Sequence, residues 1–146
     1  MVKYKTYIDP DGEEMVLIYA KERTSLVDEL ERLAGGEWTE IIGYSDGVIV
    51  RLDPYEAECF IVEDGRVYAL IGGKRLWVKE RLYMLEEALD HRFVKLNQSC
   101  IANIGKIKSF DTTLAGSIIA IFESGYRDYI SRRQLRTVKE RIGFKR

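Results

Sequence analysis

The stretch Phe93–Asn103, with the sequence FVKLNQSCIAN, gives the clearest indication of fold and function in this 146-residue chain. Four apolar residues are expected to anchor it in a core: Phe93, Leu96, Cys100 and Ile101. Lys95, Asn97 and Gln98 would then project from the surface. Asn and Gln side chains can hydrogen-bond adenine at two positions, and Lys suits phosphate or guanine. The stretch therefore favours a folded segment that presents polar side chains to nucleic acid.

Short apolar segments separated by turn residues surround this stretch. The segments expected to form strands are 39–44, 48–52, 59–62, 67–71, 76–78, 93–96, 104–110, 117–122 and 126–130. Turn signals join several of them, at Ser45-Asp46-Gly47, Asp64-Gly65 and Gly72-Gly73. Short helices are expected at 81–89 and at the end of the chain, where the apolar face is Leu135, Val138 and Ile142. The pattern predicts a mostly β domain with short helices over residues 38–146.

Residues 1–37 form a separate small segment in this interpretation. Residues 2–8 and 15–19 are expected to be strands, with a turn at Asp9-Pro10-Asp11-Gly12 between them. Thr24 or Ser25 is expected to cap a short helix that ends at Gly35-Gly36. A β-β-α segment of this size is small for a core of its own. We therefore expect it to pack on the rest of the chain or on a second copy, as a dimerisation or regulatory segment.

The net charge of −1 conceals a division between the two parts of the chain. Residues 1–64 carry six Lys and Arg against sixteen Asp and Glu, whereas residues 65–146 carry seventeen against eight. Many of the positive charges alternate with apolar residues in expected strands and in the closing helix, so they decorate a folded surface. A cationic surface on a rigid scaffold suits phosphate contacts, because neutralising phosphates releases condensed counterions.

The start of the closing helix is the second concentration of candidate contacts. Ser131 and Gln134 fit a capping box, which makes Ser131 the expected N-cap residue of the helix. Arg132 and Arg133 then fall in the first turn, where the helix dipole disfavours cations. A phosphate or the edge of a guanine would explain two arginines in that place. Arg136 lies one turn further along.

Several function classes lose support from the sequence. No G-x-x-x-x-G-K, H-E-x-x-H or G-x-G-x-x-G motif is present, and His91 is the only histidine. No enzyme activity, cofactor or metal is therefore expected. Cys59 and Cys100 lie in apolar contexts and are expected to be free buried thiols. No apolar run is long enough to span a bilayer and the N-terminus lacks an export signal, so we expect a cytoplasmic protein that is not membrane-inserted.

Three separated blocks resemble the LytTR DNA-binding domain. The first is Phe93–Ile107 and the second is Tyr129–Leu135, YISRRQL, which together resemble the family pattern F-x-R-I-H/S-R/K/N-S-Y/F/C-I-V-N-L-x-x-I and a later V-S-R-R-x-L. The Asp64-Gly65-Arg66 turn and the Leu82–Leu89 helix stand at the expected places before them. The resemblance covers about residues 41–144 and implies an elongated LytTR-like β-sandwich, preceded here by the β-β-α segment. It also implies a bacterial transcriptional regulator that reads successive major grooves of DNA through loops.

The resemblance carries DNA-contact roles onto particular positions. Gln98 matches the base-contacting position of the family, and Arg133 matches the arginine at the start of the closing helix. Gly65 matches the first hairpin loop of the family. Because glycine has no side chain, Arg66 would make any DNA contact from that loop. The remaining expected DNA contacts are Lys95, which replaces a common Arg, Asn97, which stands where His or Ser is usual, and the helix residues Arg132 and Arg136.

The resemblance also implies partners. The chain is similar to the stand-alone class of LytTR regulators, since the roughly 40 residues before the domain are too few for a receiver domain. We expect double-stranded DNA as the partner, a homodimer, and a membrane protein encoded nearby. Two alternatives stay open: a protein–protein module that antagonises a LytTR regulator, and single-stranded RNA binding through Tyr68, Trp77 and Tyr126.

Overall fold

The computed structural model describes residues 2–13, 15–34, 41–113 and 115–143, and these fall into two compact units. Unit 1 is Met1–Trp38 and unit 2 is Thr39–Arg146. The glycine stop expected at Gly35-Gly36 and the first two residues of the strand expected at 39–44 lie outside the described residues. No helix in the described ranges is both long and apolar enough to cross a membrane.

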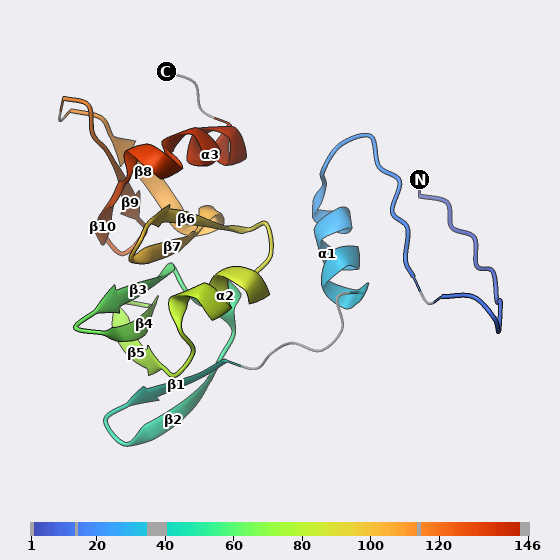
Figure 1. The fold of residues 1–146 in the computed structure, drawn as a ribbon, viewed down its shortest axis with the longest axis horizontal. Coiled ribbons are helices and arrows are strands. Elements are labelled where there is room, and N and C mark those ends of the chain that lie inside the picture. The colour runs from blue at the N-terminus through green and yellow to red at the C-terminus, as the bar shows by residue number, and fades with distance from the viewer. Residues whose placement is uncertain (1, 14, 35–40, 114, 144–146) are drawn as a thin grey trace. The chain divides into compact units, whose positions relative to one another are not determined.

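Unit 2 is built on two antiparallel sheets (Figure 1). The seven-stranded sheet has the order β2-β1-β5-β4-β3-β7-β6, with the strands β1 (Ile41–Ser45), β2 (Val48–Leu52), β3 (Cys59–Glu63), β4 (Arg66–Ile71), β5 (Lys74–Val78), β6 (Phe93–Asn97) and β7 (Cys100–Asn103). The three-stranded sheet has the order β10-β9-β8, with β8 (Ile107–Asp111), β9 (Ile118–Phe122) and β10 (Arg127–Ile130). The helices of unit 2 are α2 (Leu82–Ala88), α3 (Arg132–Ile142) and two 3-10 turns at Pro54–Glu56 and Ile104–Lys106. The predicted mostly β fold with short helices is confirmed.

Two Asp-Gly turns set the register of their hairpins as the sequence predicts. Asp46 and Gly47 between β1 and β2 have φ angles of 45° and 78°, and Asp64 and Gly65 between β3 and β4 have φ angles of 51° and 76°. Two consecutive residues with positive φ form the tight turn whose twist matches that of paired strands. The pairs that close the two hairpins are Ser45 with Val48 and Glu63 with Arg66.

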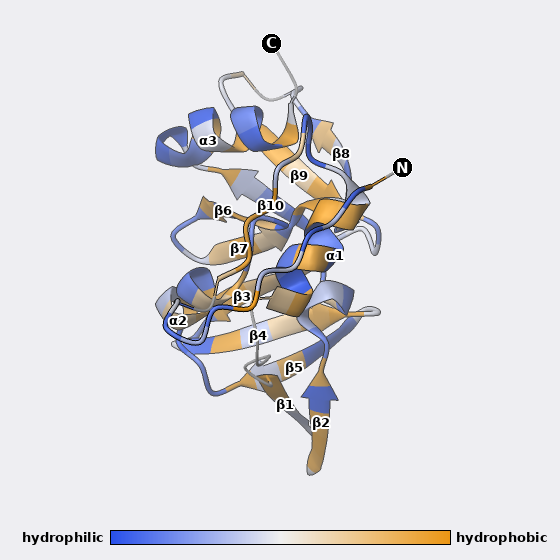
Figure 2. Cartoon of the chain, turned by 90° about the vertical axis from the view of Figure 1, so that its right-hand side faces the viewer, coloured by the Kyte–Doolittle hydropathy of each residue, from blue (hydrophilic) through white to orange (hydrophobic). Residues whose placement is uncertain are grey.

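The interior strands β3 and β7 contribute to a core on each face of the seven-stranded sheet. On one face, Cys59 and Cys100 belong to a buried cluster that includes Phe122 of β9 and Val138 of α3. On the other, Phe60 and Ile101 join a cluster that the α2 residue Leu85 completes. Alternation of side chains along a strand produces this division. Figure 2 shows β9 in orange along its length and α3 largely in blue, as expected for a buried strand and an exposed helix.

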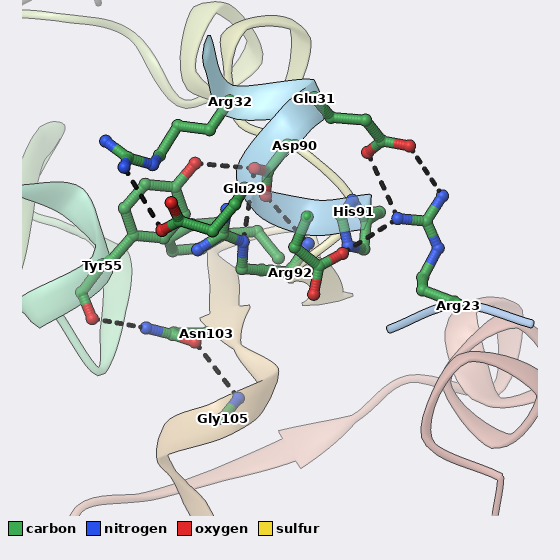
Figure 3. A network of polar contacts seen from close by, with 12 residues as sticks. Arg23, Glu29, Glu31, Arg32, Tyr55, Asp90, His91, Arg92, Asn103 and Gly105 are labelled. Atoms are coloured by element: carbon green, nitrogen blue, oxygen red, sulfur yellow. Dashed lines mark hydrogen bonds and ion pairs between the residues drawn. The ribbon is translucent and has the colours of Figure 1, made fainter. Parts of the chain in front are cut away.

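A polar network fixes the end of β7 that lies farthest from Gln98 (Figure 3). The amide nitrogen of Asn103 donates to the carbonyl oxygens of Tyr55 and Ala57, at 2.9 and 3.0 Å. The Asn103 Oδ1 atom accepts from the Gly105 N–H, which caps the following 3-10 turn. The hydroxyl of Tyr55 donates to Asp90 at 2.6 Å, and the Arg92 guanidinium lies 4.0 Å from the centre of the Tyr55 ring. Asn103 is thus a structural residue.

Unit 1 differs from the prediction. Its helix α1 (Ser25–Ala34) forms as expected, with Thr24 Oγ1 accepting from the Val27 N–H and with Arg23 ion-paired to Asp28 and Glu31. The strands predicted at 2–8 and 15–19 are wrong, because the described residues there are not in strands. A two-stranded hairpin is only marginally stable without a surface to pack on, and tyrosines such as Tyr4 and Tyr7 are exposed here.

An ion pair that spans the three-stranded sheet predicts a pH dependence. Hydrogen bonds from Thr113 and the contact with Arg127, 2.6 Å away, lower the pKa of Asp111 to about 2. Since the pKa of an unfolded Asp is about 3.9, this carboxylate stabilises the fold above about pH 4. That contribution is lost as the pH falls toward 2. The carboxyl carbon signal of Asp111 should titrate near pH 2 by NMR, and the Asp111→Asn variant should lose stability less steeply on acidification. Titration of Asp111 near pH 4 would contradict this.

Candidate nucleic-acid interface

The β6–β7 turn presents Gln98 to solvent. Gln98 and Ser99 are exposed and form the turn itself, between strands whose apolar residues are buried. The four predicted anchors are confirmed as core residues: Phe93, Leu96, Cys100 and Ile101. The anchored strands hold the backbone of this two-residue turn at a defined place, so the Gln98 side chain projects from a fixed point, which favours contact with a base edge.

Asn97 does not project from the surface, which corrects the sequence prediction. Its side chain is 1% exposed. Its amide nitrogen donates to Asp128 Oδ1 at 2.9 Å and to the Tyr129 carbonyl oxygen at 2.8 Å, and its Oδ1 atom accepts from the Ser99 N–H at 2.8 Å. Burial leaves no path to a base, and the amide's hydrogen-bonding atoms are already engaged inside the protein. Asn97 therefore positions the turn that carries Gln98.

The Asn97 contacts continue into β10. The Asp128 carboxylate accepts from the Tyr126 hydroxyl at 2.9 Å and from the Tyr129 N–H at 2.9 Å. Burial of Tyr126 and the neighbouring Asp128 carboxylate raise the pKa of Tyr126, so the hydroxyl stays protonated as a donor. This network was missed at the sequence level. In the sequence, the one indication of this network is the alternation of residues in β10, which places Asp128 at a partly buried position. The alternation does not identify Asn97, 31 residues away, as the partner of Asp128.

The start of α3 follows directly from β10. Ser131 Oγ accepts from the Gln134 N–H at 3.3 Å, which confirms Ser131 as the N-cap. The reciprocal half of the capping box is absent, because the Ser131 N–H donates to the Leu96 carbonyl oxygen at 2.9 Å. That bond holds the start of α3 against β6. Arg132 and Arg133 are both exposed in the first turn of the helix.

Three loops meet at one end of unit 2, on the left of Figure 1. Ile61 pairs with Cys100 and the Val62 N–H donates to the Ser99 carbonyl oxygen at 2.9 Å, so the Asp64-Gly65 turn lies beside the Gln98 turn. The Ser131 contact with Leu96 brings the start of α3 to the other side of the same turn. We call this surface, formed by Asp64–Arg66, Gln98–Ser99 and Ser131–Arg133, the three-loop end.

The other predicted contacts are placed differently. Arg66 is exposed at the three-loop end, with its guanidinium 5.5 Å from the centre of the Trp77 ring. Arg136 has a side chain that is 92% exposed and pairs with Glu140 at 3.3 Å on the surface of α3. Lys95 is half-buried and its ammonium lies 3.6 Å from Glu86 of α2, so it is directed toward α2. The structure therefore places Arg66, Gln98, Arg132 and Arg133 on neighbouring loops of the three-loop end.

One motif that resembles a catalytic signature has a structural explanation. Gly43–Gly47, GYSDG, fits the G-x-S-x-G pattern of hydrolases, but Ser45 ends β1 and is followed by the turn into β2. The hydrolase pattern needs a turn from a strand into a helix.

Cys59 and Cys100 are free and buried as predicted. Contact with Cys59 and burial raise the pKa of Cys100, which keeps the thiol protonated.

Comparison with known proteins identifies the family and the fold. A family model described as the LytTr DNA-binding domain matches residues 47–143. The chain belongs to the LytTR family. The LytTr DNA-binding domain of a putative methyl-accepting/DNA response regulator from Bacillus cereus has the same fold, with a TM-score of 0.67 at 16% identity over 73% of this chain and 100% of that one.

Curated relatives in Staphylococcus aureus strains NCTC 8325 and COL are each described as an uncharacterized HTH-type transcriptional regulator. Both are 29% identical to this LytTR chain over 102 residues, which is 70% of the chain and 69% of each relative. In unit 2, strands β6 to β10 separate α2 from α3. These two helices are therefore not consecutive and do not form a helix-turn-helix.

Proposed function

We propose that this LytTR protein is a sequence-specific double-stranded DNA-binding regulator of transcription. It would contact successive major grooves through the Gln98 turn and the start of α3. The observation that carries the proposal is that Arg66, Gln98, Arg132 and Arg133 are all exposed on the neighbouring loops of the three-loop end. LytTR family membership supports the choice of DNA as the partner. Such a regulator would act in the cytoplasm, where bacterial DNA lies.

The chemistry of each side chain suggests its role in the complex. Arg133 suits the O6 and N7 acceptors of guanine, and Gln98 suits adenine. Arg132, Arg136 and Arg66 would contact phosphates. Lys95 would reach a phosphate only by leaving Glu86. Asn97 supports the Gln98 turn without a DNA contact of its own.

The assembly and partners belong to the same proposal. A homodimer would place two such surfaces on a direct or inverted repeat, so that half-site spacing follows the symmetry of the protein. Unit 1 would be a dimerisation or regulatory segment. A membrane protein encoded nearby would supply the signal.

Replacement of Gln98 by Ala tests the base-contact role of the turn. Because Gln98 is exposed, the variant should fold with unchanged stability. Its affinity for the preferred duplex should fall by about 1–3 kcal/mol, with weaker discrimination at one base pair. Binding titrations against the preferred duplex and single-base variants measure both. If the variant bound each duplex with the same affinity as the wild type, Gln98 would not contact a base.

The proposal as a whole is tested by selection of duplexes from a random library, followed by mobility shifts over a range of salt concentrations. We expect one enriched motif and a logarithm of affinity that falls linearly with the logarithm of salt concentration. DNA upstream of the protein's own gene is a natural fragment to include. Failure to enrich any motif, together with equal affinity for all duplexes, would contradict sequence-specific binding.

A further inference from the structure

The loop between β5 and α2, Lys79–Arg81, adjoins the three-loop end (Figure 1). Val78, the last residue of β5, pairs with Val67, the second residue of β4. Because paired strands lie about 4.8 Å apart, the antiparallel register places Lys79 beside Arg66 of the three-loop end. Both basic residues of the loop are exposed. The loop is therefore a fourth segment at this end of unit 2, next to the surface already assigned to DNA.

Aromatic rings hold two cations at this place. The Lys79 ammonium lies 5.4 Å from the centre of the Tyr44 ring, and the Arg66 guanidinium lies 5.5 Å from the centre of the Trp77 ring. The centres of the two rings are 5.1 Å apart. A ring attracts a cation without neutralising its charge, and the contact restricts the freedom of a long side chain. The two cations are thus held in place with their charge available to an anion.

Arg66 and Lys79 differ in this respect from several other basic residues of unit 2. Three of those residues are paired with carboxylates: Arg75 with Glu63, Lys95 with Glu86, and Arg127 with Asp111. Within the ranges that the structure describes, Arg66 and Lys79 form no ion pair with a carboxylate. The Oε2 atom of Glu80, between the two basic residues of the loop, is buried. The exposed surface of the loop is therefore mainly positive.

The order of the strands determines where this pair of cations lies relative to the other candidate contacts. The sheet runs β5-β4-β3-β7-β6, so the Gln98 turn between β6 and β7 lies between the β5–α2 loop and the start of α3. From β5 to β6 there are four strand spacings, or about 19 Å. That span exceeds the roughly 12 Å width of the major groove. With the Gln98 turn in a groove, cations on its two sides would reach phosphates on both sides of that groove.

We propose that the β5–α2 loop is a fourth DNA-contacting loop, in which Lys79 binds a backbone phosphate next to the one bound by Arg66. Arg81 adds a second positive charge from the same loop. The inference rests on the proposed DNA-binding function and adds the backbone contact on the side of the groove opposite α3. Phosphate contacts fix the orientation of a protein on the duplex without reading sequence. Lys79 therefore orients the Gln98 turn and contributes equally to binding of all duplexes.

Replacement of Lys79 by Ala in the full chain tests the proposal. Affinity for the selected duplex and for a scrambled duplex should each fall about fivefold, and the salt slope should decrease by about 1. Lys79→Arg keeps the charge and should retain both the affinity and the slope. Lys74→Ala is the matched control, because it removes the same charge from the exposed opposite end of β5 and should change neither. Circular dichroism should show wild-type stability for all three variants, since both lysines are exposed.

Ethylation of DNA phosphates, followed by separation of bound and free duplexes, locates the contact. The reference point is the base pair at which Gln98→Ala relaxes discrimination. In Lys79→Ala, interference should disappear at phosphates on one side of that base pair, and in Arg132→Ala at phosphates on the other side. Loss of the same phosphates in both variants would contradict the proposed order of contacts and overturn the proposal.

The affinities give two further outcomes that overturn the fourth loop. One is a Lys79→Ala variant with the affinity and salt slope of the wild type, and the other is a Lys74→Ala variant that loses as much affinity as Lys79→Ala. If either occurs while Arg133→Ala loses specificity, the fourth loop is wrong and the DNA-binding proposal stands. A wild-type chain that binds no duplex overturns both proposals.

Discussion

Replacement of Asn97 by Ala should lower the free energy of unfolding by about 2–4 kcal/mol, because it removes three hydrogen bonds made by a buried side chain and leaves a cavity in its place. Asp128 and the Tyr129 carbonyl oxygen lose a donor, and the Ser99 N–H loses its acceptor. Since the Ser99 bond shapes the Gln98 turn, specific DNA affinity should fall as well, although Asn97 itself is buried.

Urea unfolding monitored by circular dichroism measures the stability change. DNA titrations at a temperature where the variant is fully folded then separate positioning from unfolding. The neighbouring exposed residue gives the control, because Gln98→Ala should lose DNA affinity without loss of stability. An Asn97→Ala protein with wild-type stability and wild-type DNA affinity would show that the network is dispensable.

The two arginines in the first turn of α3 should have different roles, with Arg133 contacting a base and Arg132 contacting a phosphate. Arg133→Ala should cost about 1–3 kcal/mol against the preferred duplex and relax discrimination at one base pair. Arg132→Ala should weaken binding to all duplexes alike and reduce the salt slope by about 1. Neither change should reduce stability, because each removes a cation from the positive end of the helix dipole.

Lys139→Ala is the matched control, since it removes one positive charge from the same helix at its far end. Equilibrium titrations at several salt concentrations, with matched and mismatched duplexes, give both the affinity and the slope. If Lys139→Ala weakened binding as much as Arg133→Ala, general charge would explain the affinity and the assignment of Arg133 would be wrong.

Local signals explain why much of unit 2 was predictable from the sequence. Asp64-Gly65 is compatible with a tight hairpin, and the alternation of β9 and the apolar face of α3 each indicate a buried side. The N-cap role of Ser131 is also local, because its bonding partner is three residues away. Such features depend on short-range sterics and hydrogen bonds, which a sequence pattern records.

Long-range partners explain what the sequence did not reveal. From the sequence alone, Asn97 is interpreted as an exposed residue that contacts bases. In the structure, the packing of β10 places Asp128 and Tyr129 beside it as hydrogen-bond partners. Gln134 fits a capping box, but the Ser131 N–H is taken by Leu96 from another strand. Residues 2–8 and 15–19 have strand-like composition, yet strand formation also needs a packing surface. In each case tertiary context decides between two local options.

Methylation interference on the selected duplex, with one chain bound per site, examines groove contact itself. Dimethyl sulfate methylates guanine N7 in the major groove, where we place Arg133 and the Gln98 turn. We predict two clusters of interfering guanines about 10 base pairs apart on one face of the duplex, and loss of one cluster in Arg133→Ala. Interference confined to adenine N3 in the minor groove, or binding that methylation does not affect, would contradict recognition through successive major grooves.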